Sequence, residues 1–193
     1  MKSDGVVFIA VYGHGGSGKT TFSNKLAAAL GAEVIHIDDF TGEGSTSDWY
    51  LDLLDKVIEP ALAGAESISY PRAKWWPGHN PDPIVDQPVT QIMIIEGTCA
   101  ARSELRSYLN LKVFIDIPRD ICIKRGLARD KGMSGRSDAE IAAIWQQWQQ
   151  WDDEYFAADK PQLVSDITVT PDTNFEDLVV KVKERLAENI SQK

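Results

Sequence analysis

Cysteine is scarce in this sequence: Cys99 and Cys122 are the two that its 193 residues contain. Two cysteines are too few for a disulfide-rich scaffold, and they stand at no spacing typical of a metal site. Chains with few thiols of this kind are typical of a reducing compartment, so we expect a cytoplasmic protein.

Basic charge is also in short supply, since 20 Lys and Arg face 29 Asp and Glu and the formal net charge is −9. Proteins that bind nucleic acids or anionic membranes through their overall charge are basic, so we expect neither partner. The apolar stretch at 6–12 is too short to cross a bilayer, and it ends in glycines rather than in a cleavage site. An anionic ligand must therefore be bound by a local arrangement of donors.

What remains is an ordinary globular composition, 43% hydrophobic and 25% charged, with a length that suits one domain over 1–193. Apolar stretches of strand length alternate with amphipathic stretches of helix length, which is typical of an α/β fold with a parallel sheet. The proline-rich stretch at 70–88 predicts a long ordered loop or a hairpin, and Pro60 should kink or end its helix. We predict five strands, at 6–12, 33–37, 91–95, 112–117 and 167–170. We predict six helices, at 19–30, 47–63, 103–109, 119–130, 138–158 and 175–190.

Residues 13–20, Gly-His-Gly-Gly-Ser-Gly-Lys-Thr, match the phosphate-loop pattern G-x-x-x-x-G-K-[ST] between a predicted strand and a predicted helix. Glycines let successive N–H groups turn toward phosphate oxygens, and the following helix adds the positive end of its dipole. Lys19 would contact the outer phosphates and Thr20 would ligate Mg²⁺, so ATP and Mg²⁺ are the expected cofactors. The predicted nucleotide site consists of loop residues and the start of the helix, namely Gly13, Gly15, Gly16, Ser17, Gly18, Lys19, Thr20 and Thr21.

Two acidic residues follow predicted strands at the sheet edge where the phosphate loop lies, Asp38 after the second strand and Glu96 after the third. Phosphoryl transfer needs a group that accepts the proton of the acceptor hydroxyl. We predict that Asp38 is this base and that Glu96 orders Mg²⁺ or its water. Asp39 remains an alternative base. A GTP switch is disfavoured, because the sequence has no Asn-Lys-x-Asp segment for guanine.

The chain resembles the uridine kinase family of phosphate-loop kinases, which includes phosphoribulokinases and bacterial pantothenate kinases. The resemblance rests on 13–20, on the Asp-Asp-Phe run at 38–40, on Glu96-Gly97 and on 125–130 before a lid. It implies a three-layer α/β/α fold with a five-stranded parallel sheet of strand order 2-3-1-4-5. It also implies that Asp38 is the base for a sugar hydroxyl.

Arginines in the second half of the chain resemble a kinase lid at about 125–137. Arg125 and Arg129 share one helix face, and Arg136 follows a glycine-containing stretch. Closing such a lid would stabilise the charge of the transferred phosphoryl group. The segment at about 47–88 is the predicted acceptor site, and its aromatic residues could equally cover the core. Its candidate residues are Asp48, Tyr70, Arg72, Trp75, Trp76 and His79.

The predicted function is ATP-dependent transfer of the γ-phosphoryl group to a hydroxyl of a small molecule, with a nucleoside favoured. A nucleoside monophosphate kinase is the main alternative, with Arg72, Arg102 and Arg106 available for an acceptor phosphate. Another small-metabolite kinase and, ranked lower, an ATP-dependent binding module also remain. The tryptophans Trp145, Trp148 and Trp151 recur at three-residue spacing on a predicted helix. This stripe predicts packing against the sheet or against a partner subunit, so a homo-oligomer is one possible outcome.

Overall fold

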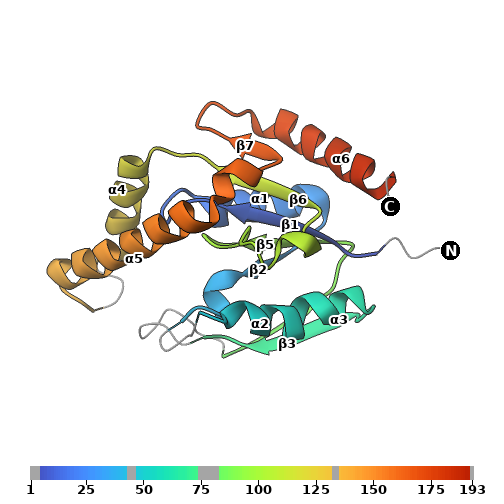
Figure 1. Cartoon of the computed structure of the whole chain (residues 1–193), viewed down its shortest axis with the longest axis horizontal. Helices are drawn as coiled ribbons and strands as arrows, with labels where there is room; N and C mark the ends of the chain where they lie inside the picture. The colour runs from blue at the N-terminus through green and yellow to red at the C-terminus, as the bar shows by residue number, and fades with distance from the viewer. Residues whose placement is uncertain (1–4, 43–46, 74–82, 132–134, 192–193) are drawn as a thin grey trace.

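The computed structural model describes residues 5–42, 47–73, 83–131 and 135–191. Its centre is a five-stranded parallel sheet with the order β2-β5-β1-β6-β7, and Figure 1 shows helices on both of its faces. Two further strands, β3 and β4, pair only with each other. Counted along the chain within the main sheet alone, its strands therefore lie in the order 2-3-1-4-5. The expected α/β fold class is confirmed.

Each strand expected from the sequence is present within a few residues of its predicted bounds. The central strand β1 pairs with β5 on one side and β6 on the other, and all six of its residues are buried. A strand covered on both faces is continuously apolar, which explains the run that the sequence shows. The main-sheet strands are β1 (Val7–Tyr12), β2 (Glu33–His36), β5 (Ile92–Glu96), β6 (Leu111–Ile115) and β7 (Ile167–Val169).

Two apolar cores lie on the opposite faces of the sheet. One joins Val11 and its neighbours on the strands to helices α1 (Lys19–Leu30) and α6 (Phe175–Ser191). The other core joins Tyr12 and further side chains on the opposite face of the strands to the segment that follows β2. That segment includes α2 (Trp49–Leu53) and α3 (Glu59–Leu62). Helices α4 (Arg119–Asp130) and α5 (Asp138–Asp159) project beside the sheet in Figure 1. No helix in the described ranges is long and apolar enough to cross a membrane.

The helix predicted at 47–63 passes Pro60 instead of ending there. A π-helical turn at Leu54–Ile58 separates α2 from α3 and includes the residue four positions before the proline. Proline lacks an N–H and crowds the carbonyl at that position, so a widened turn there lets the helix continue.

The helix predicted at 103–109 is wrong, because only a short 3₁₀ turn, Arg106–Tyr108, forms there. The N–H groups of Leu105, Tyr108 and Leu109 bond to carbonyls three residues earlier rather than four. Seven residues are too few to sustain an α-helix without strong packing, so tighter turns connect the neighbouring elements.

The segment at 70–88 contains the antiparallel hairpin of β3 (Ser67–Pro71) and β4 (Ile84–Pro88). The alternating buried side chains of β3 join the core that contains Tyr12, next to the π-helical turn and α3. Residues 74–82, which include Trp75, Trp76 and His79, lie outside the described residues.

Candidate active site

The phosphate loop joins β1 to α1, as the pattern predicts. Gly16 and Gly18 have φ values of 82° and 91°, a region that favours glycine. A Cβ added to Gly16 would collide with the carbonyl of Cys122 on α4, so the loop packs directly against that helix. The backbone conformation therefore favours glycine at both positions, and close packing also requires it at Gly16.

The loop carries polar groups that fit a chain of phosphates. The hydroxyl oxygen of Ser17 is buried and has no hydrogen-bond partner among the described residues. The ammonium group of Lys19 donates to the carbonyl oxygen of His14 at 3.0 Å, and its side chain is 8% exposed. Inward N–H groups, an unpaired hydroxyl and a lysine at a helix N-terminus together suit a bound polyphosphate.

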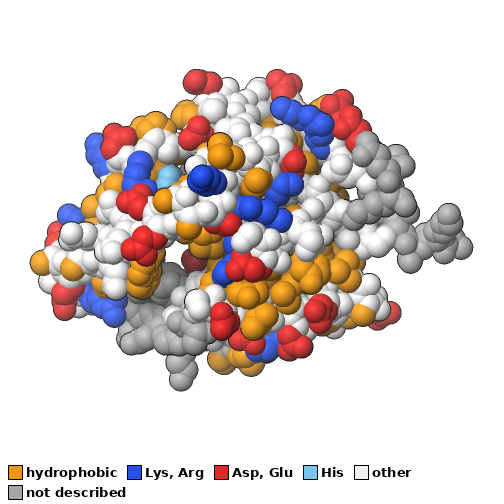
Figure 2. All heavy atoms as spheres, viewed as in Figure 1, with side chains coloured by type: hydrophobic (Ala, Val, Ile, Leu, Met, Phe, Trp, Pro, Cys, Tyr) orange, Lys and Arg blue, Asp and Glu red, His pale blue; other side chains and the backbone are white. Residues whose placement is uncertain are grey.

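The loop forms one wall of a cavity of about 1660 Å³. In Figure 2 the surface is hollowed beside α5, and acidic and basic side chains are interspersed over this face. The cavity brings together the loop and the predicted base, metal ligands and lid arginines. The predicted residues that line it are Gly15, Gly16, Gly18, Lys19, Thr20, Thr21, Asp38, Glu96, Arg125, Arg129 and Arg136. Gly13 and Ser17 are buried behind this wall.

Asp38 and Asp39 are separated by the direction of their side chains. Asp38 lines the cavity, where the surrounding protein and the charge of Glu96 raise the pKa of its carboxyl. Lys19 and other nearby cations act in the opposite direction. Asp39 is 7% exposed, and its Oδ1 lies 3.0 Å from the Nε of Arg72 on the hairpin. Asp39 is therefore an internal anchor of the hairpin, and Asp38 is the carboxylate that faces the cavity.

Glu96 ends β5 directly opposite His36 in the register of β2 and β5. The His36 Nδ1 lies 2.8 Å from the Glu96 Oε2, and the Glu96 side chain is 7% exposed. This hydrogen bond raises the pKa of His36, although burial opposes the effect. His36 is thus a paired polar group that orients Glu96, and the parallel register is the feature that brings the two together.

Arg125 and Arg129 both lie on α4 and line the cavity. Arg129 forms two hydrogen bonds with its neighbour Asp130, from Nε to Oδ1 at 2.6 Å and from Nη2 to Oδ2 at 3.1 Å. Asp38 and Glu96 are also close enough to act on the charge of Arg129. The lid arginines and the cavity carboxylates therefore face one another.

Three residues predicted for the acceptor lie away from the cavity. Tyr70 is 2% exposed and stacks on Phe40 with ring centroids 4.8 Å apart. Arg72 pairs with Asp39, and Asp48 begins α2 outside the cavity lining. Core packing uses Tyr70 and the hairpin anchor uses Arg72, so these two positions do not support the predicted binding roles. Asp48 is exposed and accepts a hydrogen bond from the Ser47 hydroxyl.

Aromatic side chains from other elements also line the cavity. Trp49 contributes from α2, and Trp148, Trp151 and Tyr155 contribute from α5. The sequence signal for them was the three-residue spacing of the tryptophans, which we interpreted as packing. Trp145 does pack, but against the phosphate loop and α4. Trp148 and Trp151 line the cavity.

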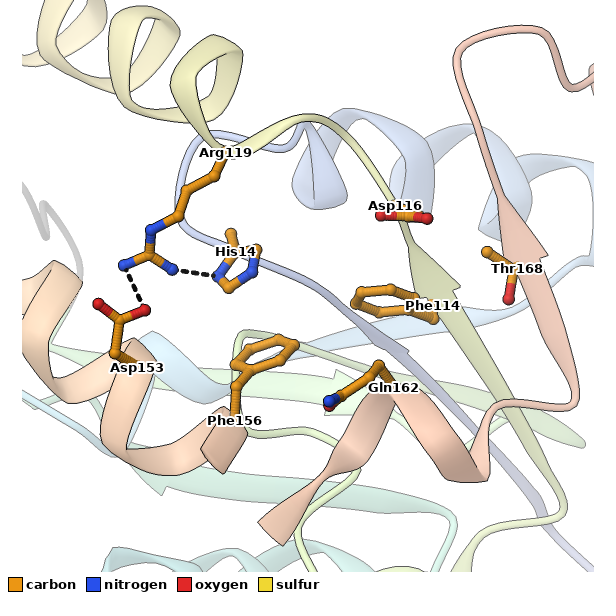
Figure 3. Close-up of a pocket in the computed structure, with 8 residues that line it drawn as sticks. All are labelled: His14, Phe114, Asp116, Arg119, Asp153, Phe156, Gln162 and Thr168. Atoms are coloured by element: carbon orange, nitrogen blue, oxygen red, sulfur yellow. Dashed lines mark hydrogen bonds and ion pairs between the residues drawn. The ribbon is translucent and has the colours of Figure 1, made fainter. Parts of the chain in front are cut away.

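A second cavity of about 580 Å³ lies behind the phosphate loop, lined in part by Phe114 and Phe156 (Figure 3). Figure 3 shows Arg119 between His14 and Asp153, with contacts of 3.1 and 2.8 Å. The His14 ring also stacks on Phe156, with centroids 4.2 Å apart. His14 is therefore held by α4 and α5, and it lines both cavities.

A model of the phosphoribulokinase/uridine kinase family matches residues 46–176. The chain belongs to this family. The uridine kinase of Borrelia duttonii is 29% identical over 147 residues, which cover 68% of this chain and 71% of that protein. The uridine kinase of Limosilactobacillus reuteri is 28% identical, with coverage of 90% and 82%.

The fold is also shared with solved kinase structures. A structure described as a possible uridine kinase from Bacillus stearothermophilus has a TM-score of 0.57 at 18% identity, covering 87% of this chain and 90% of that one. Family and fold together make the protein a phosphotransferase, an ATP-dependent kinase that acts on a small molecule.

Proposed function

We propose that this kinase transfers the γ-phosphoryl group of ATP to a hydroxyl of a nucleoside. The observation that carries the proposal is the position of Asp38, which shares one cavity with the phosphate loop and with an aromatic wall. A carboxylate in this place would accept the proton of a hydroxyl aligned with the transferred group. The raised pKa of Asp38 makes it a stronger base than an ordinary aspartate.

The phosphate loop would hold the nucleotide. A phosphate oxygen would replace Asp152 as the acceptor of the Gly15 N–H, and the buried hydroxyl of Ser17 would be a further donor. Lys19 would exchange its carbonyl partner for the outer phosphates. Gly13 and Gly16 allow the close approach of neighbouring backbone that this loop shape requires.

Mg²⁺ fits the oxygen donors at the start of α1 and the end of β5. Thr20 offers a hydroxyl, and Glu96 offers a carboxylate that His36 already orients. No cluster of three or more His, Cys, Asp or Glu suited to a metal occurs in the described part of the chain. Few protein ligands are needed, because Mg²⁺ in kinases is held largely by substrate phosphates, whose charge it neutralises.

Residues of about 125–137 would act as the lid. Arg125, Arg129 and Arg136 line the cavity from this segment and would meet the charge on the transferred phosphoryl group. Closing the segment over the cavity would also exclude water, which would otherwise compete with the acceptor hydroxyl.

A nucleoside suits the part of the cavity that aromatic side chains line, because the flat base would stack well on their rings. Trp49, Trp148 and Trp151 supply that wall. This arrangement replaces the predicted acceptor segment at 47–88 with one residue of that segment and two of α5.

The paired state of three arginines disfavours a nucleoside monophosphate as acceptor. Arg72 contacts Asp39 at 3.0 Å, Arg102 contacts Glu104 at 2.6 Å, and Arg106 contacts Asp159 at 3.0 Å. An acceptor phosphate would have to displace a carboxylate from each arginine that it used.

We also expect the enzyme to act in the cytoplasm, since Cys99 and Cys122 are free thiols.

The test is a panel of acceptors with magnesium ATP, comparing nucleosides, their monophosphates, sugars, pantothenate and shikimate-like alcohols by ADP release. Nucleosides should give the highest kcat/KM. Asp38→Asn should lower kcat by roughly a hundredfold or more, the usual scale for a general base, while ATP binding stays near the wild-type value. A monophosphate that outperforms its nucleoside would instead establish the alternative, and unchanged turnover in Asp38→Asn would remove the base from its role.

A further inference from the structure

Trp145 lies between the phosphate loop and α4. Its side chain is 4% exposed, and a Cβ added to Gly15 would be 3.5 Å from its ring. A Cβ added to Gly126 on α4 would collide with the same ring. The indole therefore fits this space because position 126 is glycine, while a Cβ at position 15 would only make ordinary contact with the ring.

The indole N–H is bonded to a buried carboxylate. Trp145 Nε1 donates to Asp130 Oδ2 at 2.8 Å, and Asp130 is 2% exposed. The same carboxylate accepts two hydrogen bonds from Arg129, at 2.6 and 3.1 Å. Asp130 thus receives three donors, and its position is set by Trp145 on one side and by Arg129 on the other.

The contact with Asp130 uses the Nε and Nη2 of the Arg129 guanidinium, while Arg129 also lines the large cavity. An unrestrained arginine has many rotamers, and ordering it at each turnover would consume binding free energy. It would also be drawn to Asp38, whose charge already acts on it. Asp130 competes with Asp38 for Arg129 and leaves the cavity carboxylate available for the acceptor.

Helix α5 contacts the phosphate loop at a second point on the same side. Asp152 Oδ2 accepts the N–H of Gly15 at 3.3 Å, and Asp152 is two helical turns after Trp145. The same helix thus contacts the loop through Trp145 and Asp152, and reaches α4 through Trp145. Because the loop also packs directly against α4 at Gly16, α4 and α5 together fix the place of Arg129 relative to the loop.

We propose that Trp145 and Asp130 are positioning residues that hold Arg129 toward nucleotide phosphates bound in the loop. The inference rests on the proposed function, since it assigns Arg129 to the transferred phosphoryl group. Neither residue needs to touch the substrate. Loss of either should lower kcat and the preference for ATP over ADP, with little effect on the KM of the acceptor.

The experiment compares Trp145→Phe, Asp130→Asn and Arg129→Ala, alone and combined. Trp145→Phe keeps an aromatic ring but removes the N–H donor. Asp120→Asn, the same chemical change at an exposed position of α4, is the matched control. Turnover is measured with the best acceptor, and the affinities for magnesium ATP and magnesium ADP are measured by calorimetry. Melting curves identify variants that do not fold, and Asp130→Asn carries the comparison if Trp145→Phe is one of them.

Arg129→Ala should lower kcat about a hundredfold, as loss of one transition-state donor does. Trp145→Phe and Asp130→Asn should each lower kcat about tenfold, the scale seen for groups that orient a functional residue. Added to Arg129→Ala, neither should have a further effect, and Asp120→Asn should match the wild type. If Trp145→Phe or Asp130→Asn lowered kcat by the same factor in Arg129→Ala as in the wild type, the positioning role would be overturned and the proposed function would stand. A wild-type protein that binds no magnesium nucleotide would overturn the proposed function, and the inference with it.

Discussion

Two adjacent carboxylates, Asp38 and Asp39, make different contacts in the folded protein, although burial raises the pKa of both. Burial and the nearby Glu96 raise the pKa of Asp38, so the folded state holds its ionised form less favourably than the unfolded chain does. This destabilisation is absent at pH values below the ordinary pKa of aspartate, and it is complete at pH values above the raised pKa of Asp38. Asp39 instead pairs with Arg72 and ties the hairpin to the end of β2.

Asp39→Asn should therefore destabilise the protein and leave its chemistry intact. The change removes a charge partner from Arg72, and we expect the free energy of unfolding to fall by about 1–3 kcal/mol. Urea denaturation measures this loss, and kcat per folded molecule should stay near the wild-type value. Asp38→Asn is the matched control: at neutral pH its stability should be unchanged or higher, and its turnover should be lost. The reverse pattern would exchange the two roles.

Single residues of the nucleotide site could be predicted where the pattern is local. The loop at 13–20 is such a case, because strand, glycines, lysine and helix follow one another directly. The sequence predicted Asp38 as the base but left Asp39 as an alternative, because the contact that occupies Asp39 comes from Arg72 on a separate hairpin. The residues now proposed for the acceptor were missed for the same reason: Trp49, Trp148 and Trp151 line one cavity only in the folded chain.

Among the elements, the contact between α4 and α5 depends on a glycine within a helix. Gly126 is buried inside α4, where a glycine normally weakens a helix. Its lack of a side chain admits the ring of Trp145. The amphipathic pattern of α4 predicted its bounds correctly. It could not predict this contact, because hydropathy does not indicate that a glycine leaves space for a ring from another helix.

Gly126→Ala should reverse the usual effect of this substitution. Alanine is about 1 kcal/mol better than glycine in an exposed helix. Here the new Cβ would displace Trp145, and we expect a loss of about 1–3 kcal/mol in unfolding free energy, as overpacking gives, with lower kcat. Ala128→Gly, at an exposed position of the same helix, is the control and should lose about 1 kcal/mol by propensity alone, with unchanged kcat. A more stable, fully active Gly126→Ala protein would contradict the close contact.

For the whole molecule, the nucleotide should act as a strong stabiliser because the site joins the loop, α4 and α5. A ligand at a hundred times its Kd adds about 2.7 kcal/mol to the free energy of unfolding. For a chain of this size that corresponds to a rise of roughly 5–10 °C in Tm. Scanning calorimetry with magnesium ATP measures the shift, which should shrink when EDTA removes the metal and vanish in Lys19→Ala. An equal shift in Lys19→Ala would place nucleotide binding elsewhere.

The two outermost strands of the main sheet, β2 and β7, have four and three residues, fewer than any strand between them. A border this short exposes few unpaired backbone groups and offers little template for a strand from another molecule. Association of copies by extension of the sheet is thus disfavoured at high concentration. Self-assembly that leaves the main sheet intact would use the helices or the β3–β4 hairpin, and the hydrogen-bonded framework beneath the phosphate loop would stay unchanged.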